Sequence, residues 1–348
     1  MKRAAYLLLI FAFIAIGLIP HSYGEEKEVE IVLSFAGDCT LGRNETSAME
    51  NSFTDVFNRQ GGRYGYFFEN VANIFFNDDL TVVNLEGPLT TGTARADKEF
   101  AFKGSPEYVN ILKEGGIDAV NLVNNHINDY GERGIKDTLT ALGGAGIGYF
   151  GAGSGYIAEI KGIKIGLLGY KGWVSGSEIK KIIAGDINSL KKKGANIVIT
   201  NFHWGDERAN YPNLIQKDLG RYAIDAGADL VIGHHPHVLQ GIEKYKGKYI
   251  VYSLANFCFG GNRNPADKDT FIFQHSLTFA YKDSGYVLKR ADAIIYPCLV
   301  SSVKGINDYK PTLASGNDWE RIRKRLIEYS APFGNLNEMV SFAKPPER

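Results

Sequence analysis

The sequence predicts an α/β fold in which two packed β-sheets are flanked by helices. Apolar runs typical of buried strands alternate with helix-like segments about five times along the chain. Several of these runs end in a polar cluster, and a pair of long antiparallel strands follows them. The hydrophobic fraction of 44% is sufficient for a large core.

The bulk composition narrows the class of protein. The 348 residues are enough for one large domain or two ordinary ones. Lys and Arg number 39, as do Asp and Glu, so the formal net charge is zero. This balance offers no electrostatic reason to bind a nucleic acid, and we expect none as a partner. The three cysteines, Cys39, Cys258 and Cys298, allow one disulfide at most.

The N-terminus has the layout of a secretory signal peptide over residues 1–24. A short basic start precedes an apolar run from Ala4 to Ile19, and the small residues Ser22 and Gly24 precede Glu25. We therefore expect an exported protein, either periplasmic or extracellular. The apolar run is somewhat shorter than the roughly 20 residues that span a bilayer. An uncleaved N-terminal membrane anchor is the alternative.

After this segment we predict a charged linker at residues 25–30, one domain over residues 31–300 and a C-terminal extension with one helix at residues 301–348. The first strand of the domain is expected at Ile31–Ala36, where Gly37 stops it. The next strand, Leu80–Val83, ends in Asn84-Leu-Glu86-Gly-Pro88, and a third covers Ile117–Val123. The intervening helices are expected at about residues 67–76, 106–114 and 132–142.

The second half of the chain continues the same alternation. Residues 156–160 and 164–169 are predicted to form a hairpin around Lys161-Gly162. Strands are expected at 195–200, 230–232 and 249–252, and two long antiparallel strands over 270–297. The helices are predicted at about residues 177–193, 212–226 and 317–329, with a polar tail after the last of them.

Potential metal ligands follow five of the predicted strands. Carboxyl ends of neighbouring parallel strands meet at one edge of a sheet, so these side chains are expected to converge. Taken singly, each has an ordinary explanation: Asp38 as a turn cap, or a histidine on the surface or satisfied in the core. Their repetition favours a site. The donors are Asp38, Glu86, Asn125, His203, His235 and His237.

The mixture of imidazole, carboxylate and amide donors suits a transition metal such as Mn, Fe, Zn or Co. Six donors exceed the needs of one catalytic ion, because such an ion keeps open positions. They suit two divalent ions about 4 Å apart, bridged by a carboxylate and acidifying a water molecule between them. His126, next to a proposed ligand, is placed to protonate a leaving group.

Other residues near these clusters are candidates for substrate binding. Arg43, Lys103, Lys171 and Arg208 lie in predicted loops that could reach an anion, although surface charge explains each of them as well. Trp204 fits either a wall of the site or an ordinary core position. Cys39 alternates out of phase with Asp38, which favours packing over ligation. The remaining substrate-binding candidates are Asn84, Asn124, His234 and Asn256.

The order and spacing of these motifs resemble the CapA family. The motifs are Gly37-Asp38, Asn84-Leu-Glu86, Phe102-Lys-Gly-Ser-Pro-Glu107, Asn124-Asn-His126, His203-Trp-Gly205, Gly233-His-His-Pro-His237 and Ser253-Leu-Ala-Asn256. That family is associated with poly-gamma-glutamate capsule synthesis and is similar to the calcineurin-like metallophosphoesterases. The resemblance covers about residues 31–300. It implies a four-layer αββα sandwich of the metallophosphoesterase type, with a dinuclear metal site at one edge.

The resemblance also implies roles for individual residues. By position, Asp38 and His237 would bind the first ion, and Glu86 would bridge the two ions. The second ion would be held by Asn125, His203 and His235, and His126 would act as general acid. Two positions depart from the phosphoesterase pattern: Thr40 stands where a histidine is usual, and the bridging residue is Glu instead of Asp. Ala255 replaces a glycine that is common in the CapA pattern.

Three functions are compatible with this sequence. The first is a metal-dependent hydrolase or transferase acting on an exported anionic polymer such as poly-gamma-glutamate. The second is a periplasmic metallophosphoesterase acting on a small anionic substrate. The third is a non-catalytic accessory subunit of a membrane-bound polymer synthase. The intact His and Asn clusters favour an active site, whereas Thr40 and the association with synthesis favour the accessory role.

Overall fold

The computed structural model of the chain describes residues 28–151, 154–282 and 285–345. The predicted signal peptide and the first part of the predicted linker lie outside these ranges. The rest of that linker, from Glu28 onward, already belongs to the first strand, which corrects the sequence prediction. Within the described ranges, no helix has both the length and the apolar character needed to cross a membrane.

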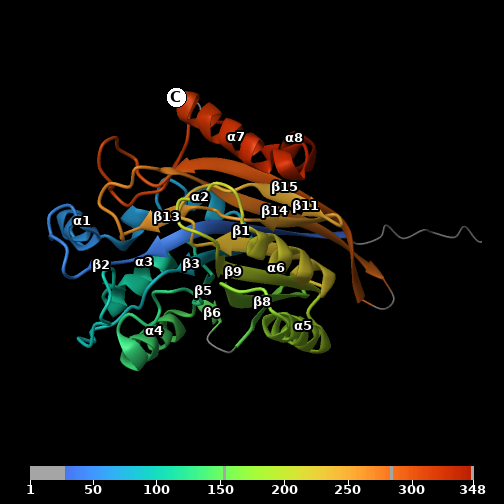
Figure 1. Cartoon of the computed structure of the whole chain (residues 1–348), viewed down its shortest axis with the longest axis horizontal. Coiled ribbons are helices and arrows are strands. Elements are labelled where there is room, and N and C mark those ends of the chain that lie inside the picture. Colours follow the sequence, from blue (N-terminus) through green and yellow to red (C-terminus); the bar gives the residue numbers. More distant parts are fainter. Residues whose placement is uncertain (1–27, 152–153, 283–284, 346–348) are drawn as a thin grey trace, which may run out of the picture.

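Two β-sheets form the centre of the molecule (Figure 1). The larger sheet has the strand order β16-β15-β14-β1-β3-β5-β6, with β13 beside β1 and β17 beside β15. Its strands are β1 (Glu28–Thr40), β3 (Leu80–Leu85), β5 (Ala119–Asn121), β6 (Gly148–Phe150), β13 (Asn256–Phe259), β14 (Asp269–Lys282), β15 (Gly285–Leu299), β16 (Thr312–Leu313) and β17 (Ser341–Phe342).

The smaller sheet has the order β11-β12-β10-β9-β8-β7. Its four central strands are parallel, and an antiparallel strand lies at each edge. The strands are β7 (Tyr156–Ile160), β8 (Ile163–Gly172), β9 (Ile197–Trp204), β10 (Leu230–His234), β11 (Ile242–Tyr245) and β12 (Lys248–Val251). A separate two-stranded pair consists of β2 (Arg43–Asn44) and β4 (Phe102–Lys103).

Helices cover the outer faces of both sheets. The helices are α1 (Phe53–Arg59), α2 (Ala72–Phe75), α3 (Val109–Glu114), α4 (Gly131–Ala145), α5 (Ser177–Lys192), α6 (Leu214–Asp225), α7 (Gly316–Ser330) and α8 (Leu336–Met339), with 3₁₀ turns η1 (Tyr64–Phe67), η2 (Pro106–Tyr108) and η3 (Ala331–Phe333). Helix α6 begins at a capping box, in which the side chains of Asn213 and Gln216 each bond to the other's backbone N–H.

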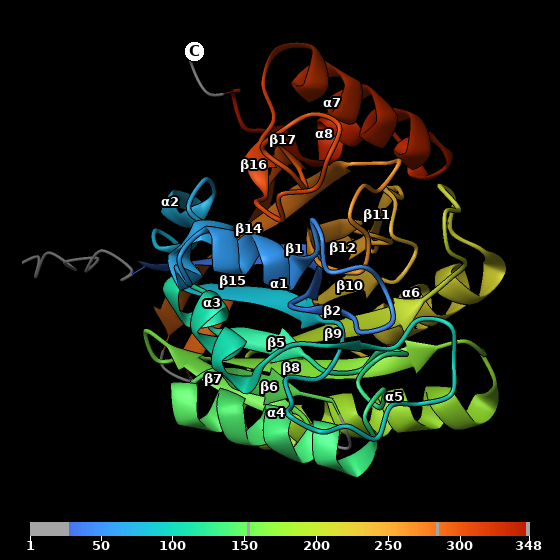
Figure 2. The ribbon, with the colours of Figure 1, turned by 90° about the vertical axis from the view of Figure 1, so that its left-hand side faces the viewer.

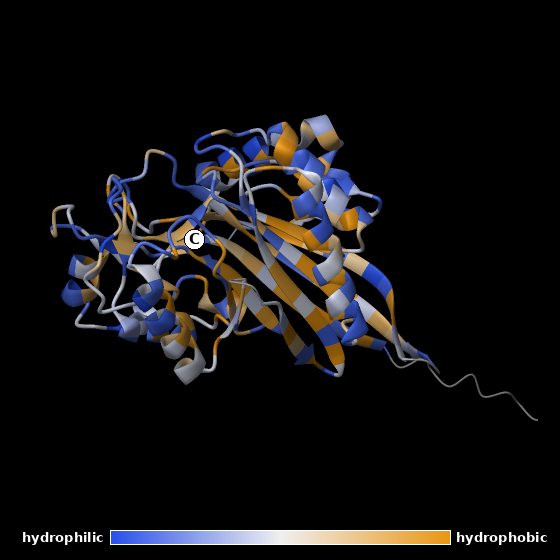
Figure 3. Cartoon of the chain, turned by 60° about the horizontal axis from the view of Figure 1, so that its bottom comes forward, coloured by the Kyte–Doolittle hydropathy of each residue, from blue (hydrophilic) through white to orange (hydrophobic). Residues whose placement is uncertain are grey.

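Three buried apolar clusters separate four layers, and they establish the αββα sandwich. The first lies between the sheets and joins residues such as Leu33 and Val82 to Ile199 and Ile232. The second lies between the outer face of the larger sheet and α1, α3 and α4. The third lies between the smaller sheet and helices α5 and α6. Figure 3 shows hydrophobic residues concentrated along the strands.

The region after residue 300 contains more than the single helix expected from the sequence. Helix α7 covers the predicted position, and the short elements η3, α8 and β17 follow it where a polar tail was predicted. Strands β16 and β17 both pair with β15. Helix α7 contributes Ile322 and Leu326 to the apolar cluster between the sheets. This end of the chain is therefore part of the main core, and α7 lies on the side away from α4 and α5 (Figure 2).

Most other predicted elements are confirmed. The hairpin of β7 and β8, the long pair β14 and β15, and helices α4, α5 and α6 lie where the sequence placed them, within a few residues. The helix predicted over residues 67–76 is wrong: only η1 and the four-residue α2 form there. The strand predicted to end at residue 200 is too short, because β9 continues through His203 to Trp204.

Candidate metal centre

The six predicted donors come together where the carboxyl ends of strands from both sheets meet. Asp38 lies near the end of β1, Glu86 directly follows β3, and Asn125 lies in the loop after β5. His203 lies near the end of β9, and His235 and His237 follow β10. Strand register accounts for part of this arrangement, because Asp38 pairs with Asn84 and His203 with His234. We call these six residues the donor cluster.

Glu86 lies at the middle of the donor cluster. Its Oε1 is 3.6 Å from His203 Nε2 and 3.9 Å from His237 Nε2. His203 Nε2 is also 2.9 Å from Asn125 Oδ1, and His237 Nδ1 is 3.3 Å from Asp38 Oδ2. Two groups of three, Glu86 with His203 and His235, and Asp38 with Glu86 and His237, each bring their ligand atoms within 4.8 Å of one another. Glu86 belongs to both groups.

Neighbouring amide side chains orient two of the donors. Asn256 Oδ1 lies 2.8 Å from His237 Nδ1, which fixes the ring and turns Nε2 toward Glu86. On the other side, Asn84 Nδ2 donates to Asp38 Oδ1 at 2.8 Å, and Asn121 Nδ2 donates to Asn84 Oδ1 at 3.0 Å. These contacts are of the kind that commonly support metal ligands from behind.

The backbone around the donor cluster is strained and tightly packed. His235 and His237 have φ values of 96° and 58°, and Ala255 has 64°, in the region that favours glycine. A Cβ at Gly37 would lie 1.9 Å from the carbonyl oxygen of Ala255. Only glycine permits this close approach, which allows the N–H of Asp38 to donate to that same oxygen at 3.0 Å. Non-glycine residues in such conformations are typical of functional sites.

Burial and neighbouring charges shift the protonation of the donor cluster. Burial holds the pKa of His203 well below its ordinary value and lowers the pKa of His235 to about 4. Burial, followed by the charge of Asp38, raises the pKa of Glu86. Burial alone would raise the pKa of Asp38 as well, but the hydrogen bonds and charges of His234 and His237 hold it well below its usual range. His203 and His235 are consequently neutral near pH 7, the state that binds metal.

A cation fits this arrangement because the buried polar groups lack other partners. Glu86 has 0% exposed surface, and neither of its carboxylate oxygens has a hydrogen-bond partner among the described residues. His235 Nδ1 is also buried, and it has no hydrogen-bond partner among the residues that the structure describes. A buried carboxylate with no hydrogen bond or cation is very costly. The donor set of imidazoles, carboxylates and an amide matches a divalent transition metal.

His126 lies beside the donor cluster in a network of its own. Its Nδ1 is 2.7 Å from Asp129 Oδ2, so the other ring nitrogen is available for proton transfer. Lys98 pairs with Asp129 and also donates to the carbonyl oxygen of Asn125 at 3.0 Å. Burial lowers the pKa of His126, although Asp129 opposes this shift. The predicted acid therefore has an orienting carboxylate, which the sequence analysis did not identify.

Comparisons with known proteins identify the family of this chain. A family model described as "Bacterial capsule synthesis protein PGA_cap" matches residues 32–261. The chain belongs to this family. "Capsule biosynthesis protein CapA" of Bacillus anthracis is 31% identical over 314 residues, which cover 79% of this chain and 73% of that protein.

Two further comparisons concern Bacillus subtilis. Its "PGA biosynthesis protein CapA" is 34% identical over 267 residues, covering 70% of this chain and 67% of that protein. A solved structure of a calcineurin-like phosphoesterase aligns with a TM-score of 0.45 and 14% identity, covering 87% of this chain and 99% of that one.

Several residues predicted to bind substrate have other contacts in this PGA_cap family member. Asn84 and Asn256 are buried and hold donors, as described above. Asn124 is buried too: it donates to the Leu85 carbonyl at 2.8 Å and accepts from the backbone N–H of His126 at 3.0 Å. His234 is only 1% exposed, with Nδ1 3.5 Å from Asp38 Oδ1. None of the four presents a free surface to a substrate, so we revise these predictions.

Arg43 also differs from its predicted role. Its Nη1 donates to the backbone carbonyls of Asn44, Glu45 and Ser47 at 3.0–3.1 Å, which stabilises its own loop. Lys103 is likewise engaged, since it donates to the Gly92 carbonyl at 2.8 Å. Lys171 pairs with His203 in the strand register and is exposed, so it remains placed for an anion.

Trp204 does not line the donor cluster, because successive residues of a strand point to opposite faces. His203 faces the other sheet, whereas Trp204 stacks on Phe202 under the outer helices, with ring centroids 4.5 Å apart. A different tryptophan borders the cluster. Trp173 follows β8, is 40% exposed and packs edge-on against His235, with centroids 4.7 Å apart.

Cys39 is buried in the apolar cluster between the larger sheet and its outer helices, as its alternation predicted. All three cysteines are free thiols.

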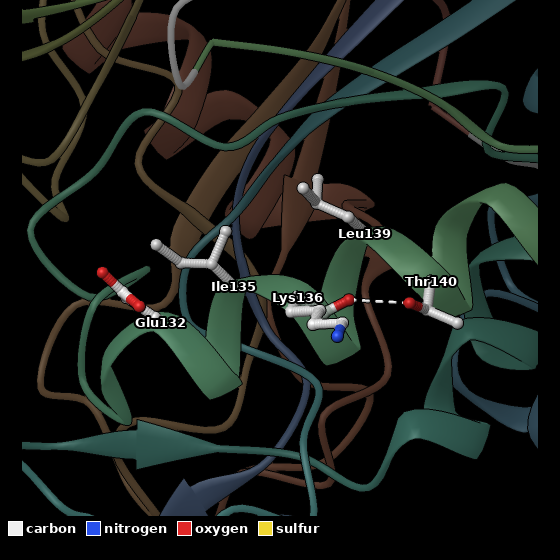
Figure 4. Close-up of a pocket in the computed structure, with 5 residues that line it drawn as sticks. All are labelled: Glu132, Ile135, Lys136, Leu139 and Thr140. Carbon is white, nitrogen blue, oxygen red and sulfur yellow. Dashed lines mark hydrogen bonds between the residues drawn. The ribbon is translucent and has the colours of Figure 1, made fainter.

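A surface hollow elsewhere on the molecule does not involve the donor cluster. It lies along α4, and its lining side chains come from that helix alone (Figure 4). They are Glu132, Ile135, Lys136, Leu139 and Thr140.

Proposed function

We propose that this chain is an exported protein of poly-gamma-glutamate synthesis that acts as a metal-dependent hydrolase or transferase on the anionic polymer. The observation that carries the proposal is Glu86, a buried carboxylate without a hydrogen-bond partner in the described structure, surrounded by donors from both sheets. The family membership and the capsule-related names of its relatives support the pathway. Capsule material lies outside the cytoplasm, which agrees with the predicted signal peptide.

The donor cluster would hold two divalent ions, of Mn, Fe or Zn. Asp38 and His237 would bind one ion, and His203, His235 and Asn125 the other, with Glu86 shared between them. When bound, such ions supply Lewis acidity and lower the pKa of water. Asp38 stays ionised for this role because its pKa is held low, and the neutral imidazoles of His203 and His235 need no deprotonation.

The chain's own residues would position and protonate the substrate. Asp129 accepts from Nδ1 of His126 and thereby selects the tautomer, and Lys98 fixes Asp129 in turn. Nε2 of His126 can then give a proton to the departing group. Trp173 would shield the imidazole of His235 from water on its exposed side. Lys171, exposed near the end of β8, would attract an anionic chain.

The test combines metal content with hydrolysis by the mature protein. We would measure bound Mn, Fe and Zn by elemental analysis in the wild type and in a His235→Ala, His237→Ala double variant. Both proteins would be assayed on poly-gamma-glutamate and on a phosphodiester. A Trp204→Phe variant is the matched control, because Trp204 lies on the opposite face of β9.

We expect close to two ions per chain in the wild type, consistent with a two-metal site. Both the ions and cleavage of poly-gamma-glutamate should be lost in the double variant and retained in the control. Cleavage of the phosphodiester alone would replace the proposal with a metallophosphoesterase. Bound metal with neither activity would support an accessory subunit of a polymer synthase. No bound metal after supplementation would contradict the metal site itself.

A further inference from the structure

A carboxylate that the sequence analysis did not select lies on the exposed side of the donor cluster. A carboxylate oxygen of Glu207 lies within 4.8 Å of the ligand nitrogens of His235 and His237. Those two nitrogens also lie within 4.8 Å of each other. Glu207 is exposed, whereas Glu86 and Asp38, the other carboxylates grouped with these histidines, are fully buried. The two imidazoles thus have buried carboxylates on the core side and one exposed carboxylate toward solvent.

From this juxtaposition we propose that Glu207 is an additional metal-binding carboxylate, which closes the metal centre on its solvent side. The inference rests on the proposed metal site and adds a ligand to it. Carboxylate oxygens and imidazole nitrogens at this spacing form a common ligand set for divalent transition metals.

The loop that carries Glu207 is held firmly against the histidine segment. The backbone N–H of Arg208 donates to the Pro236 carbonyl at 2.8 Å, directly between His235 and His237 in sequence. Gln240 Nε2 donates to the Ala209 carbonyl at 2.8 Å. Asn210 Nδ2 donates to the Leu239 carbonyl at 3.1 Å. The backbone beside Glu207 is therefore held next to the histidine segment, within reach of the Glu207 side chain.

The number of protein ligands available to one ion leaves room for the carboxylate of Glu207. The group of Asp38, Glu86 and His237 offers three protein ligands for one ion. Thr40, two residues after Asp38, is buried with its hydroxyl unpaired among the described residues. Glu207, next to His237, would add a fourth ligand from another direction.

Electrostatics also favours a cation beside Glu207. An unneutralised carboxylate at the entrance would repel the anionic polymer that the site is proposed to act on. A carboxylate bound to a divalent ion no longer presents that charge. The position of Glu207 therefore suits a carboxylate that binds a metal ion. It does not suit a carboxylate that faces an anionic substrate without a bound cation.

The experiment titrates Mn²⁺ into the EDTA-treated mature protein and follows free Mn²⁺ by its electron paramagnetic resonance signal. Glu207→Gln removes the charge and keeps the size of the side chain. Asp206→Asn is the matched control, because it removes the same charge from the adjacent position. Asp206 accepts a hydrogen bond from Asn213 at 3.0 Å, and an asparagine can still accept it. Glu86→Gln reports on the buried part of the site, and circular dichroism verifies folding of each variant.

We expect Glu207→Gln to weaken at least one Mn²⁺ site by about tenfold or more, which is the scale of effect for removing even an outer-shell partner. Asp206→Asn should change neither site by more than about twofold, since Asp206 belongs to none of the ligand groups found among the described residues. Equal affinities in Glu207→Gln and Asp206→Asn would overturn the role of Glu207. If Glu86→Gln still abolished binding in that case, the proposed metal site would stand without it. Absence of Mn²⁺ binding by the wild type would reject both.

Discussion

Within the donor cluster, the larger sheet supplies the oxygen donors, whereas the smaller sheet supplies the nitrogen donors. Asp38, Glu86 and Asn125 come from β1, β3 and the loop after β5. All three histidines of the donor cluster come from β9 and the segment after β10. Within the donor cluster neither half offers a mixed set of ligands, so its six donors meet only when the two sheets pack. The proposed ligand Glu207 would add one oxygen donor from the side of the smaller sheet.

The two halves are also held in different ways. On the oxygen side, a chain of buried amides runs from Asn121 through Asn84 to Asp38. On the nitrogen side, the backbone itself is constrained, with positive φ angles at His235 and His237. Side-chain hydrogen bonds therefore hold Asp38, whereas backbone conformation, together with the contact from Asn256, aims the imidazoles of His235 and His237. The following predictions test this difference.

The largest effect is expected at Glu86, which belongs to both ligand groups. Glu86→Gln should abolish binding of both ions and all metal-dependent activity. In EDTA, however, its melting temperature should stay close to that of the wild type, because Glu86 makes no hydrogen bond among the described residues that the amide would break. Metal should raise the melting temperature of the wild type only. Differential scanning calorimetry with and without Mn²⁺ measures both effects, and retention of metal by the variant would contradict a bridging role.

A smaller effect is expected from the residues that orient the two halves. Asn256→Ala, behind His237, and Asn84→Ala, behind Asp38, should each lower metal affinity about 10- to 100-fold. Asn84→Ala should in addition destabilise the metal-free protein by about 1–3 kcal/mol, because Asn121 loses a buried acceptor. Isothermal titration calorimetry and urea unfolding separate these effects. Equal stability losses in the two variants would remove the distinction between the halves.

Metal binding should depend on pH through the nitrogen half. Burial disfavours protonated His237, but the charges of Glu86 and Asp38 outweigh this and raise its pKa to about 10. The metal-free ring is thus protonated at pH 7 and must lose its proton to bind a metal. Affinity should therefore rise with pH below that pKa, by up to about tenfold per unit for one released proton. Titrations in buffers of different ionisation enthalpy count the protons, and a value of zero would exclude this ligand role.

The smallest effect concerns the two tryptophans near His203. Trp173→Ala should leave metal content unchanged and lower kcat/KM by about threefold to tenfold, the scale of an aromatic contact. Trp204→Phe should change neither quantity but should reduce stability, because Trp204 fills the core and its Nε1 donates to the Tyr252 carbonyl at 2.9 Å. Steady-state kinetics and thermal unfolding distinguish the two. A loss of kcat/KM in Trp204→Phe, with none in Trp173→Ala, would indicate that Trp204 lines the site.

Long periodic elements and the donor cluster could be predicted from the sequence, because both follow regular patterns. The hairpin of β7 and β8 and helix α5 show clear periods, and each donor directly follows an apolar run. The two alternatives for Trp204 stayed open because the strand was predicted to end at residue 200. Once the strand is extended to Trp204, alternation places His203 and Trp204 on opposite faces.

Other features have no local signal. Glu207 and Trp173 lie in loops, where side-chain direction follows from tertiary contacts such as the bond from Arg208 to Pro236. Strand β17 has two residues and forms because β15 offers it an edge. The aromatic composition around η1 and α2 suggested one longer helix, which tertiary packing replaces with two short turns.

The most direct test of the two-halves account is anomalous diffraction from crystals of the mature protein soaked in Mn²⁺. The account predicts two peaks about 4 Å apart, as in other two-metal sites. One should contact Asp38 and His237, the other His203 and His235, and Glu86 should contact both. A single peak bound by one sheet alone, or no peak beside Glu86, would contradict the claim that the sheets jointly build the centre.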